Sequence, residues 1–297
     1  MNHGKEGDMF SGTYTAIVTP FNLDGSVDYD KLKALIDIQA DAGVDGIVPV
    51  GTTGESPTLD YDEHNKVIDA AIEACRGRIK VIAGTGSNST AEALELTRHA
   101  KEAGADATLQ VTPYYNKPNQ EGLIRHFSAV ADLGLPVVLY NVPSRTAREI
   151  AVDTIVKLFE HPKIVAIKEA GGSVDRVSAI LRQCDITILS GDDSLTFPMM
   201  AVGGKGVISV AANVAPAPLT RMTHLALKGK WDEARELHLK YYCLFRDLFI
   251  DTNPIPVKAA MAMMGLIEEV YRLPLCPMNN KLKKQLRGTM EEVGLLS

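Results

Sequence analysis

One lysine, Lys168, ends an apolar run in the segment KIVAIKEAGGS, residues 163–173. An ammonium group at the end of a buried strand is costly, so its presence needs a reason. A lysine amine attacks carbonyl carbons once its pKa falls from about 10.4 toward neutrality, and apolar surroundings can impose that cost of roughly 4 kcal/mol. Phosphate binding is a second chemistry open to a lysine in this position. A structural ion pair is a third, although Glu169 is a poor partner because neighbours on a strand point to opposite faces.

A tyrosine at the end of the preceding apolar run favours the carbonyl chemistry. Tyr140 ends the strand-like run in VVLYNVPSRT, residues 137–146. A phenol one strand away from Lys168 is near enough to move protons while an imine forms. The alternative is a core tyrosine whose hydroxyl binds backbone groups, which is the usual arrangement for a lone tyrosine.

Strand and helix signals alternate along most of the chain. Eight apolar runs predict strands, namely TYTAIVTP, VDGIVPVG, RIKVIAG, ADATLQVTP, LPVVLYNVP, KIVAIKEA, DITILSG and GKGVISVAA. Between them, apolar residues recur three and four apart, as in DYDKLKALIDIQADAG, which predicts helices. Strands rich in Val and Ile and joined by helices indicate an α/β protein with a parallel sheet covered on both faces. A (β/α)₈ TIM barrel is the leading architecture, and an open doubly wound sheet is the second.

Three regions are expected along the sequence. Residues 1–10 are predicted to be a disordered N-terminal tail, residues 11–223 the catalytic barrel, and residues 224–297 a C-terminal helical appendage. The stretches 231–249 and 254–271 have helical character and no strand-like run, so they are expected to pack onto the barrel.

Composition and the scattered ionisable residues exclude several classes of protein. A net charge of −6 leaves no excess of positive charge that would bind nucleic acid or anionic membranes. Four cysteines without close pairing, and no apolar run of spanning length, predict a cytoplasmic protein with reduced thiols. The seven histidines lack metal-ligand spacing. Asp192 and Asp193 indicate a helix cap with first-turn charge rather than a metal site, so we expect neither metal nor cofactor.

In the predicted barrel, each candidate residue can be assigned to one end of a strand. In barrel enzymes the chemistry lies at the carboxyl ends of the strands. GTTGES (51–56) follows the second run, TPYYNKP (112–118) the fourth and SGDD (190–193) the seventh, so these loops should meet Lys168 and Tyr140 at one mouth. The glycine-rich GGKG (203–206) precedes the eighth run and is expected at the opposite end, as an ordinary turn.

Seven short motifs carry a resemblance to a known family. GTTGES, TPYYNKP, LYNVPSRT, IVAIKEA, LSGDD, GVISV and NPIPVK stand in the order and spacing of the dihydrodipicolinate synthase family, in the pyruvate-dependent class I aldolase superfamily that includes N-acetylneuraminate lyase. Each motif is weak alone, whereas seven in register are specific. The resemblance implies a lyase that condenses pyruvate with L-aspartate 4-semialdehyde, giving 4-hydroxy-tetrahydrodipicolinate in the diaminopimelate route of lysine biosynthesis.

The resemblance also implies a role for each matching residue. Lys168 is expected to form the Schiff base with pyruvate, and Tyr140 to relay protons. Thr52 and Thr53 are expected to bind the pyruvate carboxylate, with Thr53 also linking Tyr140 to a second tyrosine, Tyr115.

The substrate pocket and the choice of acceptor follow from the same resemblance. The backbones of Gly191 and Ile208 are expected to line the pyruvate pocket. Arg145 is expected to bind the carboxylate of the semialdehyde, because its planar guanidinium can hold two oxygens at once. Sialic acid lyases of the superfamily lack this arginine motif.

An oligomer and a regulator are implied as well. Tyr115 is expected to enter the site of a neighbouring subunit in a homotetramer built as a dimer of dimers. L-lysine, the end product, is expected to inhibit the enzyme at a subunit interface, and the matching positions are Ser56, His64, Asn88, Glu92 and Tyr114. A carboxylate such as that of Glu92 can pair with an ammonium group, and binding beside Tyr115 can reach the catalytic residues.

Two alternatives to this function remain open from the residues alone. Another pyruvate-dependent class I aldolase, acting on a sugar acid, would share the lysine and the tyrosine. A non-catalytic barrel that senses a small carboxylate would keep Arg145 and the threonines, but it has no use for a reactive lysine beside a proton relay.

Overall fold

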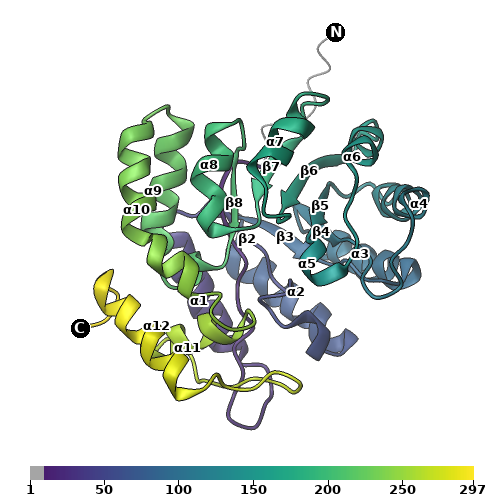
Figure 1. Cartoon of the computed structure of the whole chain (residues 1–297). Coiled ribbons are helices and arrows are strands. Elements are labelled where there is room, and N and C mark those ends of the chain that lie inside the picture. Colours follow the sequence, from purple (N-terminus) through teal and green to yellow (C-terminus); the bar gives the residue numbers. More distant parts are fainter. Residues whose placement is uncertain (1–9) are drawn as a thin grey trace.

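A closed barrel surrounded by helices forms the centre of the molecule (Figure 1). The computed structural model describes residues 10–297. The tail predicted over 1–10 lies outside the described residues except for Phe10. That side chain is buried, with its ring centre 6.0 Å from the ring of Tyr14 on the first strand. The described chain therefore begins with a core residue.

Eight parallel strands close the barrel in sequence order, which confirms the predicted TIM barrel. They are β1 (Gly12–Thr15), β2 (Gly46–Ile47), β3 (Lys80–Gly84), β4 (Ala107–Val111), β5 (Val137–Asn141), β6 (Ile164–Glu169), β7 (Thr187–Ser190) and β8 (Gly206–Ser209). Since β1 pairs with both β2 and β8, the sheet is closed and the open doubly wound alternative is wrong. Gly206 permits the closure, because an added Cβ would lie 1.9 Å from the carbonyl oxygen of Gly12.

Nine helices follow the strands of the described chain, and all of them except the short α5 at the barrel mouth cover the outside of the barrel (Figure 1). They are α1 (Tyr29–Asp41), α2 (Tyr61–Cys75), α3 (Thr90–Ala103), α4 (Gln120–Ala131), α5 (Pro143–Thr146), α6 (Val152–Phe159), α7 (Val174–Leu181), α8 (Thr196–Ala201) and α9 (Pro216–Leu227). Five of them begin at a residue whose side chain accepts a hydrogen bond from a first-turn N–H, namely Asp28, Asp60, Ser89, Asn119 and Ser173. Local sequence therefore fixes where these helices start.

The C-terminal region consists of α10 (Trp231–Asp247), α11 (Ile255–Met263) and α12 (Asn280–Glu292), of which α12 ends the chain in yellow in Figure 1. Leu244, Val257 and Leu286, one from each helix, belong to the same buried cluster as Ile17 and Ile47 of the barrel. The appendage and this side of the barrel thus share one hydrophobic core.

Two predicted boundaries differ from the structure. α9 runs through the predicted division at 223/224, because the whole helix packs on the barrel as its eighth covering helix, and we propose to place the division after Leu227. The helix predicted over 254–271 ends at Met263, since Gly265 adopts a φ of +72°, a conformation that stops a helix. Within residues 10–297, every helix is too short or too polar to traverse a lipid bilayer.

Candidate active site

Lys168 and Tyr140 lie side by side at the carboxyl end of the barrel. β5 and β6 pair in a register that sets Tyr140 opposite Lys168. The Lys168 Nζ lies 4.4 Å from the centre of the Tyr140 ring, and both side chains are buried. Glu169 instead binds the Arg176 guanidinium at 3.0 Å, as expected for a residue on the other face of the strand. The strand register thus brings the amine and the phenol together.

Burial favours the neutral, nucleophilic form of the Lys168 amine. The loss of water around it lowers the pKa of Lys168 to about 8. The negative charge of Asp193 opposes this shift, and the positive charge of Arg145 adds to it. With such a pKa, about a tenth of the amine is neutral at pH 7, compared with well below a thousandth for an ordinary lysine.

Thr52, rather than Thr53, is the threonine tied to the phenol. Burial raises the pKa of Tyr140, whereas the charge of Arg145 and a hydrogen bond with the Thr52 side chain oppose that rise. The Thr53 hydroxyl accepts a hydrogen bond from Asn253 Nδ2 at 3.0 Å. The sequence resemblance assigned the link from Tyr140 to Thr53. In this chain the phenol has its contact with Thr52, whereas the Thr53 hydroxyl binds Asn253 of the C-terminal region.

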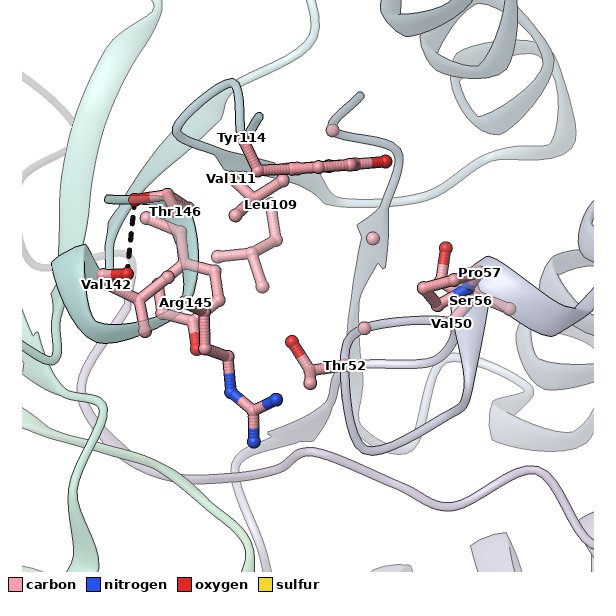
Figure 2. Close-up of a pocket in the computed structure, with 14 residues that line it drawn as sticks. Val50, Thr52, Ser56, Pro57, Leu109, Val111, Tyr114, Val142, Arg145 and Thr146 are labelled. Carbon is pink, nitrogen blue, oxygen red and sulfur yellow. Dashed lines mark hydrogen bonds between the residues drawn. The ribbon is translucent and has the colours of Figure 1, made fainter. Parts of the chain in front are cut away.

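Two cavities adjoin at Tyr140 and Arg145, which line both. The first has a volume of about 330 Å³ and lies on the side of the amine. Its walls include Thr52, Thr53, Lys168, Gly191, Asp192 and Asn253. The second has a volume of about 220 Å³ and is drawn in Figure 2. The two cavities therefore share part of their walls, including Tyr140 and Arg145.

Arg145 reaches from α5 toward Thr52 in the second cavity (Figure 2). α5 starts directly after β5 and has a proline in its first turn, so the short helix is fixed relative to Tyr140. The Arg145 Nη2 donates a hydrogen bond to the Asn253 carbonyl oxygen at 3.2 Å. Figure 2 shows Tyr114 across the cavity from Arg145, with apolar side chains of β4 between them. The cavity therefore offers one cationic and several apolar contacts.

Two residues predicted for the site do not line these cavities. Ile208 lies on β8 opposite Tyr14, with its side chain fully buried in the barrel interior. Tyr115 has 91% of its surface exposed and a positive φ of 68°. In a single chain, the second predicted tyrosine is thus on the surface, next in sequence to the cavity residue Tyr114.

Four of the five residues predicted to bind lysine surround a third cavity of about 350 Å³, namely Ser56, His64, Glu92 and Tyr114. The fifth, Asn88, contributes its carbonyl oxygen to a hydrogen bond from Asn116 at 2.8 Å. The Glu92 carboxylate accepts a hydrogen bond from the Ser87 hydroxyl at 2.7 Å, and burial lowers the pKa of His64. Since Tyr114 and Ser56 also line the cavity of Figure 2, the two spaces are neighbours.

Asp192 and Asp193 form the predicted helix cap with first-turn charge, and Asp193 also acts on the charge of Lys168. Asp192 does cap the turn, accepting a hydrogen bond from the Ser194 N–H at 3.2 Å. Asp193 is buried and accepts hydrogen bonds from the Ser209 hydroxyl (2.5 Å) and from the backbone N–H groups of Val210 and Ala211 (3.0 Å each). Burial raises the pKa of Asp193 to about 6. The sequence shows two consecutive aspartates, but only the fold shows that the second one, Asp193, faces the end of β8.

The described residues 10–297 contain no group of three or more His, Cys, Asp and Glu side chains arranged to hold a metal ion. A closed barrel with a buried amine beside a phenol at the carboxyl ends of its strands is typical of lyases that act through a lysine. Comparison with known proteins identifies the family within this class. The model of the dihydrodipicolinate synthetase family matches residues 9–293. The chain therefore belongs to this family.

Similar proteins agree on the activity. The chain is 55% identical over 287 residues to the 4-hydroxy-tetrahydrodipicolinate synthase of Methanococcus vannielii, covering 96% of this chain and 99% of the relative. It is 52% identical to the structure of the synthase from Methylacidiphilum fumariolicum SolV, with a TM-score of 0.94 and 96% of each chain covered. The activity of the chain is that of a 4-hydroxy-tetrahydrodipicolinate synthase, a lyase of lysine biosynthesis.

One similar solved structure contains a substrate. The dihydrodipicolinate synthase of Acinetobacter baumannii, complexed with pyruvate, is 45% identical with a TM-score of 0.94, covering 96% of this chain and 99% of that one. A second similar structure, the enzyme of Cyanidioschyzon merolae, has lysine bound. It is 43% identical with a TM-score of 0.94, covering 97% of this chain and 99% of that one.

The lowered pKa predicts that Lys168 reacts with amine reagents at unusually low pH. An ammonium group does not react, so labelling should rise with pH to a midpoint near pH 8 for Lys168, against about 10.4 for exposed lysines. Brief acetylation at a series of pH values, followed by peptide mass spectrometry, measures this midpoint. Asp193→Asn should move it lower, because it removes a charge that favours the ammonium form. Asp192→Asn is the neighbouring control, and a midpoint near pH 10 contradicts the prediction.

Proposed function

We propose that the Lys168 amine forms the Schiff base with the keto carbon of pyruvate. The observation that carries this proposal is an amine with a pKa near 8 beside the Tyr140 phenol in a cavity at the barrel mouth. The neutral amine attacks the carbonyl carbon, and the carbinolamine loses its hydroxyl group as water to give the imine. Tyr140, hydrogen-bonded to Thr52, is positioned to pass the protons that these steps require.

Thr52, Thr53 and Gly191 are proposed to hold the pyruvate carboxylate. All three line the cavity that contains the Lys168 side chain. Hydroxyl and N–H donors bind a carboxylate without placing a second cation beside the amine, which must lose its proton to react. Ile208 would act through its backbone only, because its side chain is part of the barrel interior.

Arg145 is proposed to select L-aspartate 4-semialdehyde as the second substrate. After imine formation, loss of a methyl proton gives an enamine whose carbon attacks the aldehyde carbon of the acceptor. The Arg145 guanidinium lines both cavities together with Tyr140 and can offer two parallel donors to the acceptor carboxylate. A sugar-acid aldolase has no need of this clamp, and a sensor barrel has no need of the reactive amine, so both alternatives are less well supported.

Substitution of Lys168 tests the nucleophile. Lys168→Ala should lose both turnover and the mass increase that borohydride reduction with pyruvate produces in the parent protein. Arg145→Ala is the matched control on the same face of the barrel, and it should keep the pyruvate adduct. Its KM for L-aspartate 4-semialdehyde should rise by roughly tenfold to a hundredfold, because a charge-assisted contact contributes about 1.5 to 3 kcal/mol. An adduct that persists in Lys168→Ala refutes the assignment.

We propose that Tyr115 completes the relay of a neighbouring subunit in a homotetramer built as a dimer of dimers. Its support is the exposed phenol, which follows the cavity residue Tyr114 and does not line the cavities of its own chain. A second subunit that covers this ring would bury its apolar surface and bring its hydroxyl near Thr52 of that subunit. The oligomer is then a requirement for catalysis.

Mixing two inactive variants tests this exchange. Tyr115→Phe keeps its own Lys168, and Lys168→Ala keeps the tyrosine that it donates, so mixed oligomers contain some complete sites. Activity should therefore return when the two variants are unfolded together and refolded. Each variant refolded alone is the control. If mixed and separate samples are equally inactive while mass measurements show mixed oligomers, Tyr115 does not act across the interface.

L-lysine is proposed to inhibit the enzyme from the third cavity. The cavity has the size for an amino acid, the Glu92 carboxylate can pair with an ammonium group, and Tyr114 connects the cavity to the active site. The similar structure from Cyanidioschyzon merolae has lysine bound, which makes the ligand chemically reasonable here. Where lysine lowers the affinity for pyruvate, pyruvate lowers the affinity for lysine by the same factor.

Activity should fall in millimolar L-lysine, and Glu92→Gln should reduce that sensitivity by at least about tenfold while leaving uninhibited turnover near that of the parent. Glu95→Gln is the matched control, since Glu95 lies on the same helix outside the cavity. Steady-state rates and titration calorimetry give the two readouts. Lysine that neither slows the parent enzyme nor releases heat on mixing refutes the site.

The cytoplasmic location stays a prediction of the proposed function. It is supported by Cys75, Cys243 and Cys276, which are free thiols.

A further inference from the structure

A second lysine, Lys258, is buried even more completely than Lys168 and takes no part in the chemistry above. Its side chain has no exposed surface, and its Nζ lies 2.5 Å from Oε1 of Glu55, whose side chain is equally buried. Lys258 belongs to α11 in the C-terminal region. Glu55 follows Thr52 and Thr53 in the GTTGES loop. The ion pair therefore joins the C-terminal helices to the loop that carries both threonines.

Glu55 also sets the backbone of that loop. It has a left-handed conformation, with φ of 55° and ψ of 36°, which is unfavourable for a residue with a side chain. Both of its carboxylate oxygens are held, Oε1 by Lys258 and Oε2 by the backbone N–H of Arg272 at 3.3 Å. The surroundings thus impose a backbone turn immediately after the threonines.

Further contacts hold the same loop from the C-terminal side. The Arg272 guanidinium binds both oxygens of Glu63 at 2.5 and 2.6 Å, and it donates to the Thr58 carbonyl oxygen at 2.8 Å. Asn253, just before α11, donates to the Thr53 hydroxyl. One C-terminal segment therefore contacts the loop before, at and after Glu55.

A buried ion pair is a poor way to add stability. Removing two charges from water costs about as much as their attraction returns, and apolar side chains of similar size often serve as well. Such a pair instead fixes geometry, because each carboxylate oxygen and each N–H group needs a hydrogen-bond partner in one particular position. A geometric role for Lys258 and Glu55 follows from this comparison.

We propose that Lys258 and Glu55 are positioning residues that hold Thr52 and Thr53 at the spacing required by the substrate carboxylate. The C-terminal helices then take part in pyruvate binding through α11, without touching the substrate. This inference rests on the proposed role of the two threonines. It predicts an effect on pyruvate affinity that is separate from stability and from the reactivity of Lys168.

The double variant Glu55→Gln/Lys258→Met tests the proposal, because it removes both charges and leaves none buried without a partner. The KM for pyruvate should rise between roughly tenfold and a hundredfold, the range expected when binding groups shift by a fraction of an ångström to an ångström. The midpoint of thermal unfolding should stay close to that of the parent. Borohydride trapping at saturating pyruvate should persist, since the Lys168 amine is unchanged.

A second Lys–Glu pair in the same region provides the matched control. Lys283 Nζ lies 2.7 Å from Oε2 of Glu269, and neither residue contacts the threonine loop in the described structure. Glu269→Gln/Lys283→Met should leave the KM for pyruvate unchanged. The proposal is overturned by a parental KM in the Glu55/Lys258 double variant, by an equal rise in the control, or by a double variant that does not fold. The last result would make the pair a folding element.

Thr53→Val separates this inference from the function on which it rests. It removes one proposed carboxylate donor and should raise the KM for pyruvate by itself. A parental KM in Thr53→Val refutes the threonine assignment. A raised KM in Thr53→Val together with a parental KM in the double variant refutes only the positioning role of Lys258 and Glu55.

Discussion

Removal of the Lys168 amine from water is the constraint on which the rest of the site depends. Lowering a lysine pKa from about 10.4 to about 8 corresponds to roughly 3 kcal/mol that the fold must supply. A closed barrel can supply it, because its strands are buried on both faces and the lysine has no route back to solvent along an open edge. The same closure aligns β5 with β6 and so fixes Tyr140 beside the amine.

Two charged groups near the Lys168 amine shift its pKa in opposite directions. Asp193 lies at the far side of the site, held by the backbone at the end of β8, and its pKa near 6 makes it mostly ionised at neutral pH. A protonated imine carries the same charge as the ammonium group, so Asp193 favours that intermediate as well. Arg145 has the opposite effect on the amine, and it is the residue proposed to bind the acceptor carboxylate. One carboxylate and one guanidinium thus act on the Lys168 amine in opposite directions.

The C-terminal helices are joined to the barrel by a shared core and by contacts with the threonine loop. They share a hydrophobic core with the barrel, and the segment 253–272 contacts the threonine loop through side chains of opposite charge and through Asn253. Asn253 also accepts from Arg145, so one residue contacts both the proposed pyruvate subsite and the proposed acceptor clamp. A loop that must present two hydroxyls to a small substrate gains from being fixed on both sides.

The sequence by itself determined the barrel and the residues at its mouth, because both follow from local patterns of apolar and polar residues. Eight Val- and Ile-rich runs alternating with amphipathic stretches leave few topologies that bury every strand, and a residue that ends a strand must lie at the carboxyl rim. The sequence did not determine which hydroxyl reaches Tyr140, or that Asp193 turns toward β8. It also extended a helix past Gly265, where the backbone turns left-handed. Least visible was the pairing of Lys258 with Glu55, which are 203 residues apart. Such contacts depend on how finished elements pack, and only the tertiary structure decides the distance between side chains that share no local pattern.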